Sequence, residues 1–557
     1  MRKIREQLPL EFRVLYAQFL ARVVDLEALS IQADIPRFIG QFAGVLILID
    51  VFRTLGFYIF GEPMLTELSF LSGTMLIAGL VAVATWDNIF PDRRDAMVFG
   101  PLPVKPRTLL MAKLAASGSL LGIGVLALNL GMGVALPQVV GAGWRFPRVL
   151  VAYWFAAAAA AVTVYGAVVA VQGITAAVLP QRWFLRLSAI LQLAGFALFL
   201  STWLFRPSFA SPRELVRALS QGRLDRWPVF WFFSLFAQIS GAFPLVSTKL
   251  AWRAWAVFGA VLLTAGVSLL LCYKRTMKKN VEEPDLVPQQ RARRRTIAMG
   301  DSVQTAVVQF TMRSLARSRQ HRVVYAFFLA IAFAVAVSTV ANVVASRHLQ
   351  FVTTGFLVST LLMQCLAVLG LRSIFSLPVS LKANWVLQVT QLNPSEDYIA
   401  ATRRAMLAMA TFPVWLTAAG LALFYRPWHQ VAEHLLVLAL AGSIITDVSL
   451  IGVSKIPFAC SYLPGKSNVQ YIFWAYTAFF VPLAVGFSSY EQSVLDRPFA
   501  YAELVSALSV AALGLWLLNR HRARSAVLYY EELELETITT LGIGSWQPTK
   551  AETRAAG

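Results

Sequence analysis

The stretch that decides the fold is Val149 to Leu179, which reads V-L-V-A-Y-W-F-A-A-A-A-A-A-V-T-V-Y-G-A-V-V-A-V-Q-G-I-T-A-A-V-L. It contains no charged residue and exceeds the about 20 apolar residues that a helix needs to cross a hydrocarbon core of about 30 Å. Because a backbone in lipid must satisfy its own hydrogen bonds, an apolar run of this length forms a helix and not a barrel strand. The stretch therefore predicts a long, tilted membrane-spanning helix.

Similar apolar runs recur along the whole chain. Of its 557 residues, 57% are hydrophobic and only 14% are charged, and the mean hydropathy is +0.63. This composition excludes a soluble globular protein. We predict an all-α, polytopic helical membrane protein with about twelve transmembrane helices in a 6+6 arrangement. The predicted spans lie near 39–60, 68–86, 109–136, 149–179, 187–205, 251–273, 323–345, 351–371, 405–425, 434–454, 469–490 and 499–518.

The formal net charge of +20 indicates membrane topology and not a nucleic-acid partner. With the N-terminus inside, most Lys and Arg residues fall in cytoplasmic loops, as the positive-inside rule predicts. The exception is 206–250, an outside loop whose aromatic and basic residues predict an amphipathic helix at the outer membrane interface. We expect an integral protein of a bacterial-type cytoplasmic (inner) membrane, with both termini cytoplasmic and membrane lipids as partners.

Changes in composition divide the chain into five segments. We predict a cytoplasmic amphipathic segment at 1–38, a first six-span half at 39–273 and a second at 323–518. Between the halves, 274–322 is a basic linker that contains R-A-R-R-R and a further amphipathic segment, and 519–557 is an acidic cytoplasmic tail. Each half has an amphipathic segment (8–30 and 302–320), then two spans and a loop with Leu-Pro-Val, which indicates a weak internal duplication.

The loop after the second span is long for a membrane protein that only needs a turn there. Trp86 to Lys113 reads W-D-N-I-F-P-D-R-R-D-A-M-V-F-G-P-L-P-V-K-P-R-T-L-L-M-A-K. Its prolines stiffen the approach to the next helix and fix where that helix begins. We interpret it as a docking surface for a partner; the alternative is that Pro and Arg only end one span and start the next. The candidate docking residues in the two loops are Asp92, Arg93, Arg94, Asp95, Leu102, Pro103, Arg107, Lys113, Leu377 and Pro378.

These residues carry a resemblance to a known family. The run from Asp92 to Asp95, then Leu102-Pro103-Val104, Arg107 and Lys113, resembles the cytoplasmic loop of ABC-2 type exporter permeases, with a looser echo at 376–406. The glutamate-rich sequence often seen early in that loop is replaced here by Asp92 and Asp95. The resemblance implies a short helix that docks on a separate ATPase subunit, and a chain made of two fused six-span permease halves.

Asp50, Arg53 and Asp447 are the clear cases of charged residues in the interior of predicted spans, where a charge is costly and should face protein or water. Asp50 and Arg53 share a helix face, so they form either an internal pair or part of a translocation path. Asp447 in the tenth span is open to the same two interpretations. The five histidines are dispersed, and Gly465-Lys466-Ser467 lacks the earlier glycine of a phosphate-binding loop, so no metal, cofactor or catalytic site is predicted.

Two classes of transporter and one other class remain after these exclusions. The leading hypothesis is the non-enzymatic permease subunit of an ATP-driven ABC exporter, with its ATPase docked on loops 87–113 and 372–404. The alternatives are an ion-coupled secondary transporter of the 6+6 type and a non-transporting membrane scaffold. Substrate, direction of transport, self-association and the role of the 456–468 loop stay open.

Overall fold

The computed structural model is built from helices. It describes residues 9–24, 35–90, 104–141, 143–179, 181–204, 211–243, 248–282, 299–318, 324–334, 352–375, 395–422, 428–451, 469–495 and 497–525, and residues 95, 99, 102, 209, 321–322, 377 and 457–458 between them. Within this part of the chain there are helices and no strands, so the all-α class is confirmed. The predicted acidic tail from 526 on and the linker at 283–298 lie outside the described residues.

Nine helical segments among the described residues are long and apolar enough to cross a membrane, which makes the chain an integral membrane protein. They lie in α3 (Ile35–Phe60), α4 (Pro63–Ala84), α7 (Pro106–Asn129), α9 (Phe146–Val178), α13 (Thr248–Glu282), α16 (Thr354–Phe375), the run of α18 (Ser395–Met406), a π-helical turn (Leu407–Thr411) and α19 (Phe412–Ala422), then α20 (Trp428–Ser449) and α22 (Pro498–Ser525). The other three predicted spans coincide with α10 (Gln181–Leu204), α21 (Val469–Val494) and a shorter apolar helix at 324–334. The number twelve stays a prediction.

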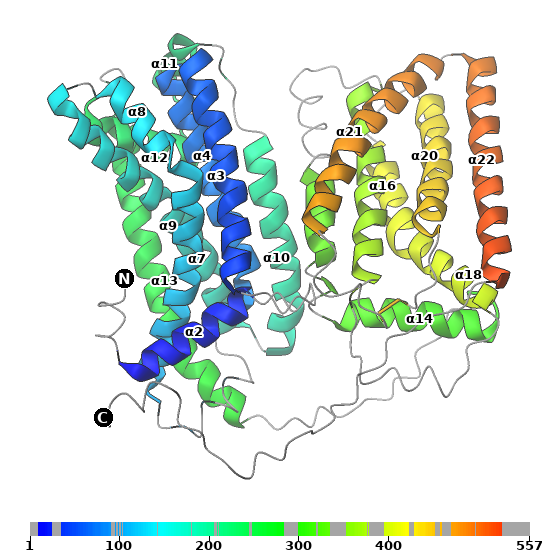
Figure 1. Ribbon diagram of the computed structural model, residues 1–557, viewed down its shortest axis with the longest axis horizontal. Coiled ribbons are helices and arrows are strands. Elements are labelled where there is room, and N and C mark those ends of the chain that lie inside the picture. The colour runs from blue at the N-terminus through cyan, green and yellow to red at the C-terminus, as the bar shows by residue number, and fades with distance from the viewer. Residues whose placement is uncertain are drawn as a thin grey trace, which may run out of the picture.

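The helices form two bundles that lie side by side, α3 to α13 in one and α16 to α22 in the other (Figure 1). In the first bundle α4 packs against α9 and α10, and α9 packs against α13. In the second bundle α16 packs against α20 and α21, and α20 packs against α22. The same pairs, taken in chain order, are thus in contact in both bundles, which is the pattern that an internal duplication produces.

A short amphipathic helix lies across the same end of each bundle (Figure 1). In the first bundle it is α2 (Leu10–Val24), which packs against α7 and α3. In the second it is α14 (Ser302–Arg317), which packs against α18. Each predicted amphipathic segment, 8–30 and 302–320, contains one of these helices, and both helices rest on the protein through their apolar faces.

The opposite end of the first bundle is closed by α8 (Met132–Val140), α11 (Pro212–Ser220) and α12 (Pro228–Ser240) (Figure 1). Phe232, Phe233 and Phe236 of α12 have no exposed surface and belong to the largest apolar cluster, between α4, α9 and α13. The prediction of an amphipathic helix at the membrane interface within 206–250 was therefore wrong for α12. Its aromatic residues fill the core because α12 packs between longer helices.

Candidate docking site and buried polar groups

The contact of α2 with α7, the first helix interface, has an apolar centre, and Tyr16 of α2 is hydrogen-bonded to Ser119 of α7 at 2.9 Å. Leu15 and Phe19, one turn apart on α2, are buried against Leu109, Ala112 and Ala116 of α7. The i, i+3 and i+7 spacing puts these three α7 residues on one helix face, and the alanines allow α2 to approach closely. A surface helix is in this way fixed to the start of the third long helix.

A buried carboxylate joins the loop after α4 to the same interface. Asp95 forms an ion pair with the ammonium group of Lys113, and it accepts a hydrogen bond from Arg22 Nη1 at 2.6 Å. Lys113 Nζ also donates to the carbonyl of Phe90 at 3.1 Å. Asp95 and Lys113 are 1% and 2% exposed. The loop, α2 and α7 are therefore tied together by a charge network shielded from water.

The predicted docking residues of the first loop fall into two groups. Asp95 and Lys113 are buried, so they hold the loop in place and present no surface to a partner. Leu102 is 49% exposed, and Arg107 at the start of α7 is also exposed. Four candidates of this loop and one of the second lie outside the described residues: Asp92, Arg93, Arg94, Pro103 and Pro378.

The contact of α14 with α18, the second helix interface, has the same apolar spacing. Tyr398, Ala401 and Ala405 of α18 are separated by the intervals found in Leu109, Ala112 and Ala116, and they pack against Val307 and Val308 of α14. The polar contacts differ. Gln304 Nε2 donates to Asp397 Oδ1 at 2.7 Å, and Arg404 donates to Gln304 and to the carbonyl of Met299.

Leu377, from the second Leu-Pro-Val, is buried beside this interface. Its carbonyl accepts a hydrogen bond from His321 Nε2 at 3.0 Å, and His321 Nδ1 lies 2.5 Å from the hydroxyl of Ser318. With Nε2 donating, Nδ1 accepts from Ser318. Burial lowers the pKa of His321, and the hydrogen bond to Leu377 opposes that shift. The ring of Phe458, from the 456–468 loop, covers the imidazole edge-on at a centroid distance of 5.2 Å.

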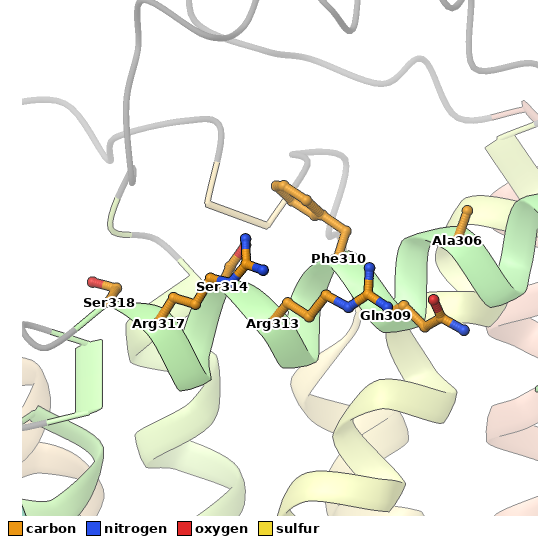
Figure 2. A pocket seen from close by; sticks show the side chains of 7 residues that line it. All are labelled: Ala306, Gln309, Phe310, Arg313, Ser314, Arg317 and Ser318. Atoms are coloured by element: carbon orange, nitrogen blue, oxygen red, sulfur yellow. The ribbon is translucent and has the colours of Figure 1, made fainter. Parts of the chain in front are cut away.

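The solvent-facing side of α14 is hollowed into a groove of ≈ 680 Å³. Figure 2 shows Phe310, Arg313 and Arg317 projecting from successive turns of the helix along this groove. Phe310 is 49% exposed, and both arginines are exposed. The groove combines an apolar side chain with two positive charges one helical turn apart.

Asp50, predicted as an intramembrane candidate, has a structural role. Its carboxylate accepts hydrogen bonds from the backbone N–H groups of Gly131 at 2.5 Å and Met132 at 3.3 Å, at the start of α8. An acid placed there neutralises the positive end of the helix dipole and satisfies unpaired N–H groups. A Cβ atom at position 131 would lie 2.9 Å from Asp50 Oδ2, so a larger residue there would displace this carboxylate.

Arg53 lies on the same helix as Asp50 and contacts α4. Its Nη2 donates to Ser69 Oγ at 2.8 Å, and its guanidinium group lies 3.8 Å from the centroid of the Phe70 ring. Gly73 leaves room for it, since a Cβ atom at that position would lie 3.0 Å from Arg53 Nη1. Arg53 thus fixes α3 to α4 through a hydrogen bond and a cation–π contact.

Asp447 has no exposed surface and is paired with Arg403 of α18. Arg403 Nε donates to Oδ1 at 2.6 Å and Nη2 donates to Oδ2 at 2.9 Å, a bidentate pair. Asn519 Nδ2 of α22 donates to the Asp447 carbonyl at 2.8 Å. Asp447 therefore ties α18, α20 and α22 together, next to the π-helical turn of 407–411.

The sequence interpretation missed two buried acids. Glu67 in α4 has no exposed surface, and it was missed because the second span was predicted to begin at 68. Glu491 of α21 lies 2.8 Å from His434 Nδ1, and His434 Nε2 lies 2.9 Å from Thr360 Oγ1 of α16. His434 and Glu491 are 57 positions apart, so no local sequence motif could predict this pair.

Comparison with known proteins does not assign the chain to a family. No family model matches it, and no curated protein or solved structure is significantly similar to it.

Proposed function

We propose that this chain is the membrane-spanning permease subunit of an ATP-driven exporter of the ABC type, energised by a separate ATPase that docks where α2 and α14 lie. The observation that carries the proposal is the repeated surface helix: in each bundle one amphipathic helix packs on the start of the helix that follows the loop with Leu-Pro-Val. A bundle that only spans lipid has no need of this element. A permease driven from outside the membrane needs a rigid contact there in both halves.

The contacts behind each surface helix supply that rigidity. In the first bundle, the buried Asp95 joins the loop to Lys113 of α7, and α7 packs against α3 and α4. In the second, Arg403 of α18 forms an ion pair with Asp447 of α20, and the backbone carbonyl of Asp447 accepts a hydrogen bond from Asn519 of α22. A force applied at α2 or α14 therefore reaches several membrane-spanning helices without passing through an exposed, flexible contact.

The exposed residues at this end suit a partner with an acidic and apolar surface. They include Leu102 and Arg107 in the first half, and Phe310, Arg313 and Arg317 of the α14 groove in the second. Arginine and aromatic side chains are enriched in the energetically important centres of protein interfaces. The ion pair of Asp95 and Lys113 fixes residue 95 of the loop to α7.

The proposal is tested by affinity purification of the tagged full chain in mild detergent, with mass spectrometry of the proteins that copurify. We expect a stoichiometric ATPase subunit. Leu102→Ala/Arg107→Ala combined with Arg313→Ala/Arg317→Ala should lower its recovery at least about tenfold, the effect of roughly 1.4 kcal/mol of binding free energy.

The matched control changes an exposed apolar–basic pair at the opposite end of the first bundle, Trp144→Ala/Arg145→Ala. Trp144 is 81% exposed, and both residues precede α9. This variant should retain the ATPase at the wild-type level. A well-folded preparation without any ATPase, or equal losses in both variants, would contradict the proposal.

A further inference from the structure

Glu67 is an acid in an environment that offers nothing to stabilise a negative charge. It has no exposed surface, and neither of its carboxylate oxygens has a hydrogen-bond partner among the described residues. Its neighbours along α4, namely Met64, Leu68, Phe70 and Leu71, are buried members of the apolar cluster that also includes the phenylalanines of α12. An ionised carboxylate in such a place costs several kcal/mol unless it is paired and hydrogen-bonded.

Asp50, a second buried acid in the same bundle, shows which contacts can stabilise a carboxylate here. It accepts two backbone hydrogen bonds at the positive end of α8, and Arg53 lies one turn further along its own helix. Glu67 has neither kind of support. The two acids differ in their hydrogen-bond donors while both are almost completely buried, so burial alone does not set their charge state.

The charged and titratable groups around α4 are few. Asp50, Arg53 and Tyr58 lie on α3, Glu62 directly precedes α4, and Arg148, Tyr153 and Tyr165 lie on α9. Arg107 and Lys113 lie at the other end of α7, and α8 and α12 contain no charged residue. The side chains of Asp87 in α5 and of Arg182 and Arg186 in α10 lie outside the described ones.

One of these groups, Tyr153, donates its hydroxyl proton to another residue. Tyr153 is close enough to interact electrostatically with Glu67. Its hydroxyl donates to Asn129 Oδ1 at 2.8 Å, and Asn129 Nδ2 donates to Thr74 Oγ1 at 3.0 Å. Arg53 is engaged with Ser69 and Phe70. The simplest way to neutralise Glu67 in this packing is a proton on its own carboxyl group.

We propose that Glu67 is a proton-binding site of the first bundle, which holds a proton out of contact with water at the end opposite α2. Glu67 lies in the first turns of α4, whereas the other end of α4 leads through α5 (Trp86–Ile89) to Phe90 at the first helix interface. Release of the proton breaks the carboxyl O–H bond and passes the proton to water, which requires α4 to separate from the helices that cover it. The site goes beyond the ATPase-docking function and does not depend on it.

Infrared spectroscopy of the purified full chain in lipid vesicles tests the proposal at neutral pH, because a protonated carboxyl group has its own C=O stretching band. We expect one such band in the wild type, its loss in Glu67→Gln, and its retention in Asp50→Asn. In D2O, the band should shift to lower frequency slowly, at the rate at which the bundle opens.

Three results would overturn the proposal: a wild-type spectrum with no protonated-carboxyl band, a band undiminished in a folded Glu67→Gln variant, or a shift complete on mixing with D2O. If Glu67→Gln does not fold, Glu67→Asp serves instead. That variant keeps the acid, so the band should move and not disappear, and an unmoved band would assign it to another residue.

Discussion

The first and second helix interfaces have the same apolar spacing but different polar contacts. Leu109, Ala112 and Ala116 receive α2, and Tyr398, Ala401 and Ala405 receive α14 at the same intervals. In the first interface the polar element is the Asp95 carboxylate with Lys113 and Arg22. In the second, Gln304 bridges Asp397 and Arg404. The comparison indicates that small residues at helical spacing define how the surface helix docks, while the polar contacts can vary.

The buried acids at the opposite end differ between the halves in a similar way. Glu67 is without a hydrogen-bond partner among the described residues, whereas Glu491 pairs with His434, which also contacts Thr360. Glu67 and Thr360 both lie in the first turns of corresponding helices, α4 and α16. A polar group, Glu67 or Thr360, thus lies in the first turns of the second span in each bundle. Among the described residues, Thr360 contacts the His434 imidazole, whereas the Glu67 carboxyl has no hydrogen-bond partner.

The largest effect is expected from breaking the charge network of the first interface. Lys113→Met leaves the Asp95 carboxylate buried without its ammonium partner, which should destabilise the protein by about 3–5 kcal/mol. Thermal unfolding in detergent, followed by circular dichroism, measures the loss. Asp95→Asn/Lys113→Met removes both charges and should recover a substantial part of it. A single variant as stable as the wild type would show that the network does not hold the loop.

A smaller effect is expected from truncating the buried residue on each surface helix. Phe19→Ala should destabilise the contact of α2 by about 3 kcal/mol, and Val308→Ala that of α14 by about 2 kcal/mol, since the smaller side chain loses less buried area. Limited proteolysis should cut α2 faster in the first variant and α14 faster in the second. Equal cutting of both helices in either variant would mean that the two interfaces do not act separately.

The smallest effect is expected in the pH dependence of the stability, measured near pH 6.5. It concerns the second interface, which lies beside His321, because the loop at 85–105 of the first half contains no histidine. Burial lowers the pKa of His321 below the ordinary 6.5. As pH falls below 6.5, the unfolded chain binds a proton while the folded ring stays neutral, so stability decreases until the pH passes the lowered pKa. His321→Gln should remove this decrease in thermal unfolding measured across that range. An unchanged pH profile would exclude His321 as its source.

Much of the fold could be predicted because its signals are local. Apolar runs such as 149–179 are long enough to specify helices without any knowledge of their neighbours, and 8–30 and 302–320 were recognised as amphipathic segments from their own residues. The aromatic residues of 228–240 led to the wrong prediction of an interfacial helix, since the same composition suits a membrane interface and a packed core. Which of the two occurs depends on the helices around α12.

The candidate site was only partly predictable. The loop was identified by its length and charge, and Leu102 and Arg107 are exposed as a docking surface requires. The sequence could not show that Asp95 and Lys113 are used internally, because their network includes Arg22, which is 73 positions from Asp95. The Arg403–Asp447 and His434–Glu491 pairs could not be predicted either, because their residues are also far apart in the sequence.

By itself, the sequence determined that this chain is a helical membrane protein, since hydropathy and helical period depend only on residues close together in the chain. Only the tertiary structure decided which charges are paired. A buried charge is stabilised by donors within about 3 Å, and those donors come from whichever helix the fold brings alongside. Asp50 accepts hydrogen bonds from the start of α8, and Asp447 is paired with Arg403. Glu67 lies among buried apolar side chains and has no hydrogen-bond partner among the described residues.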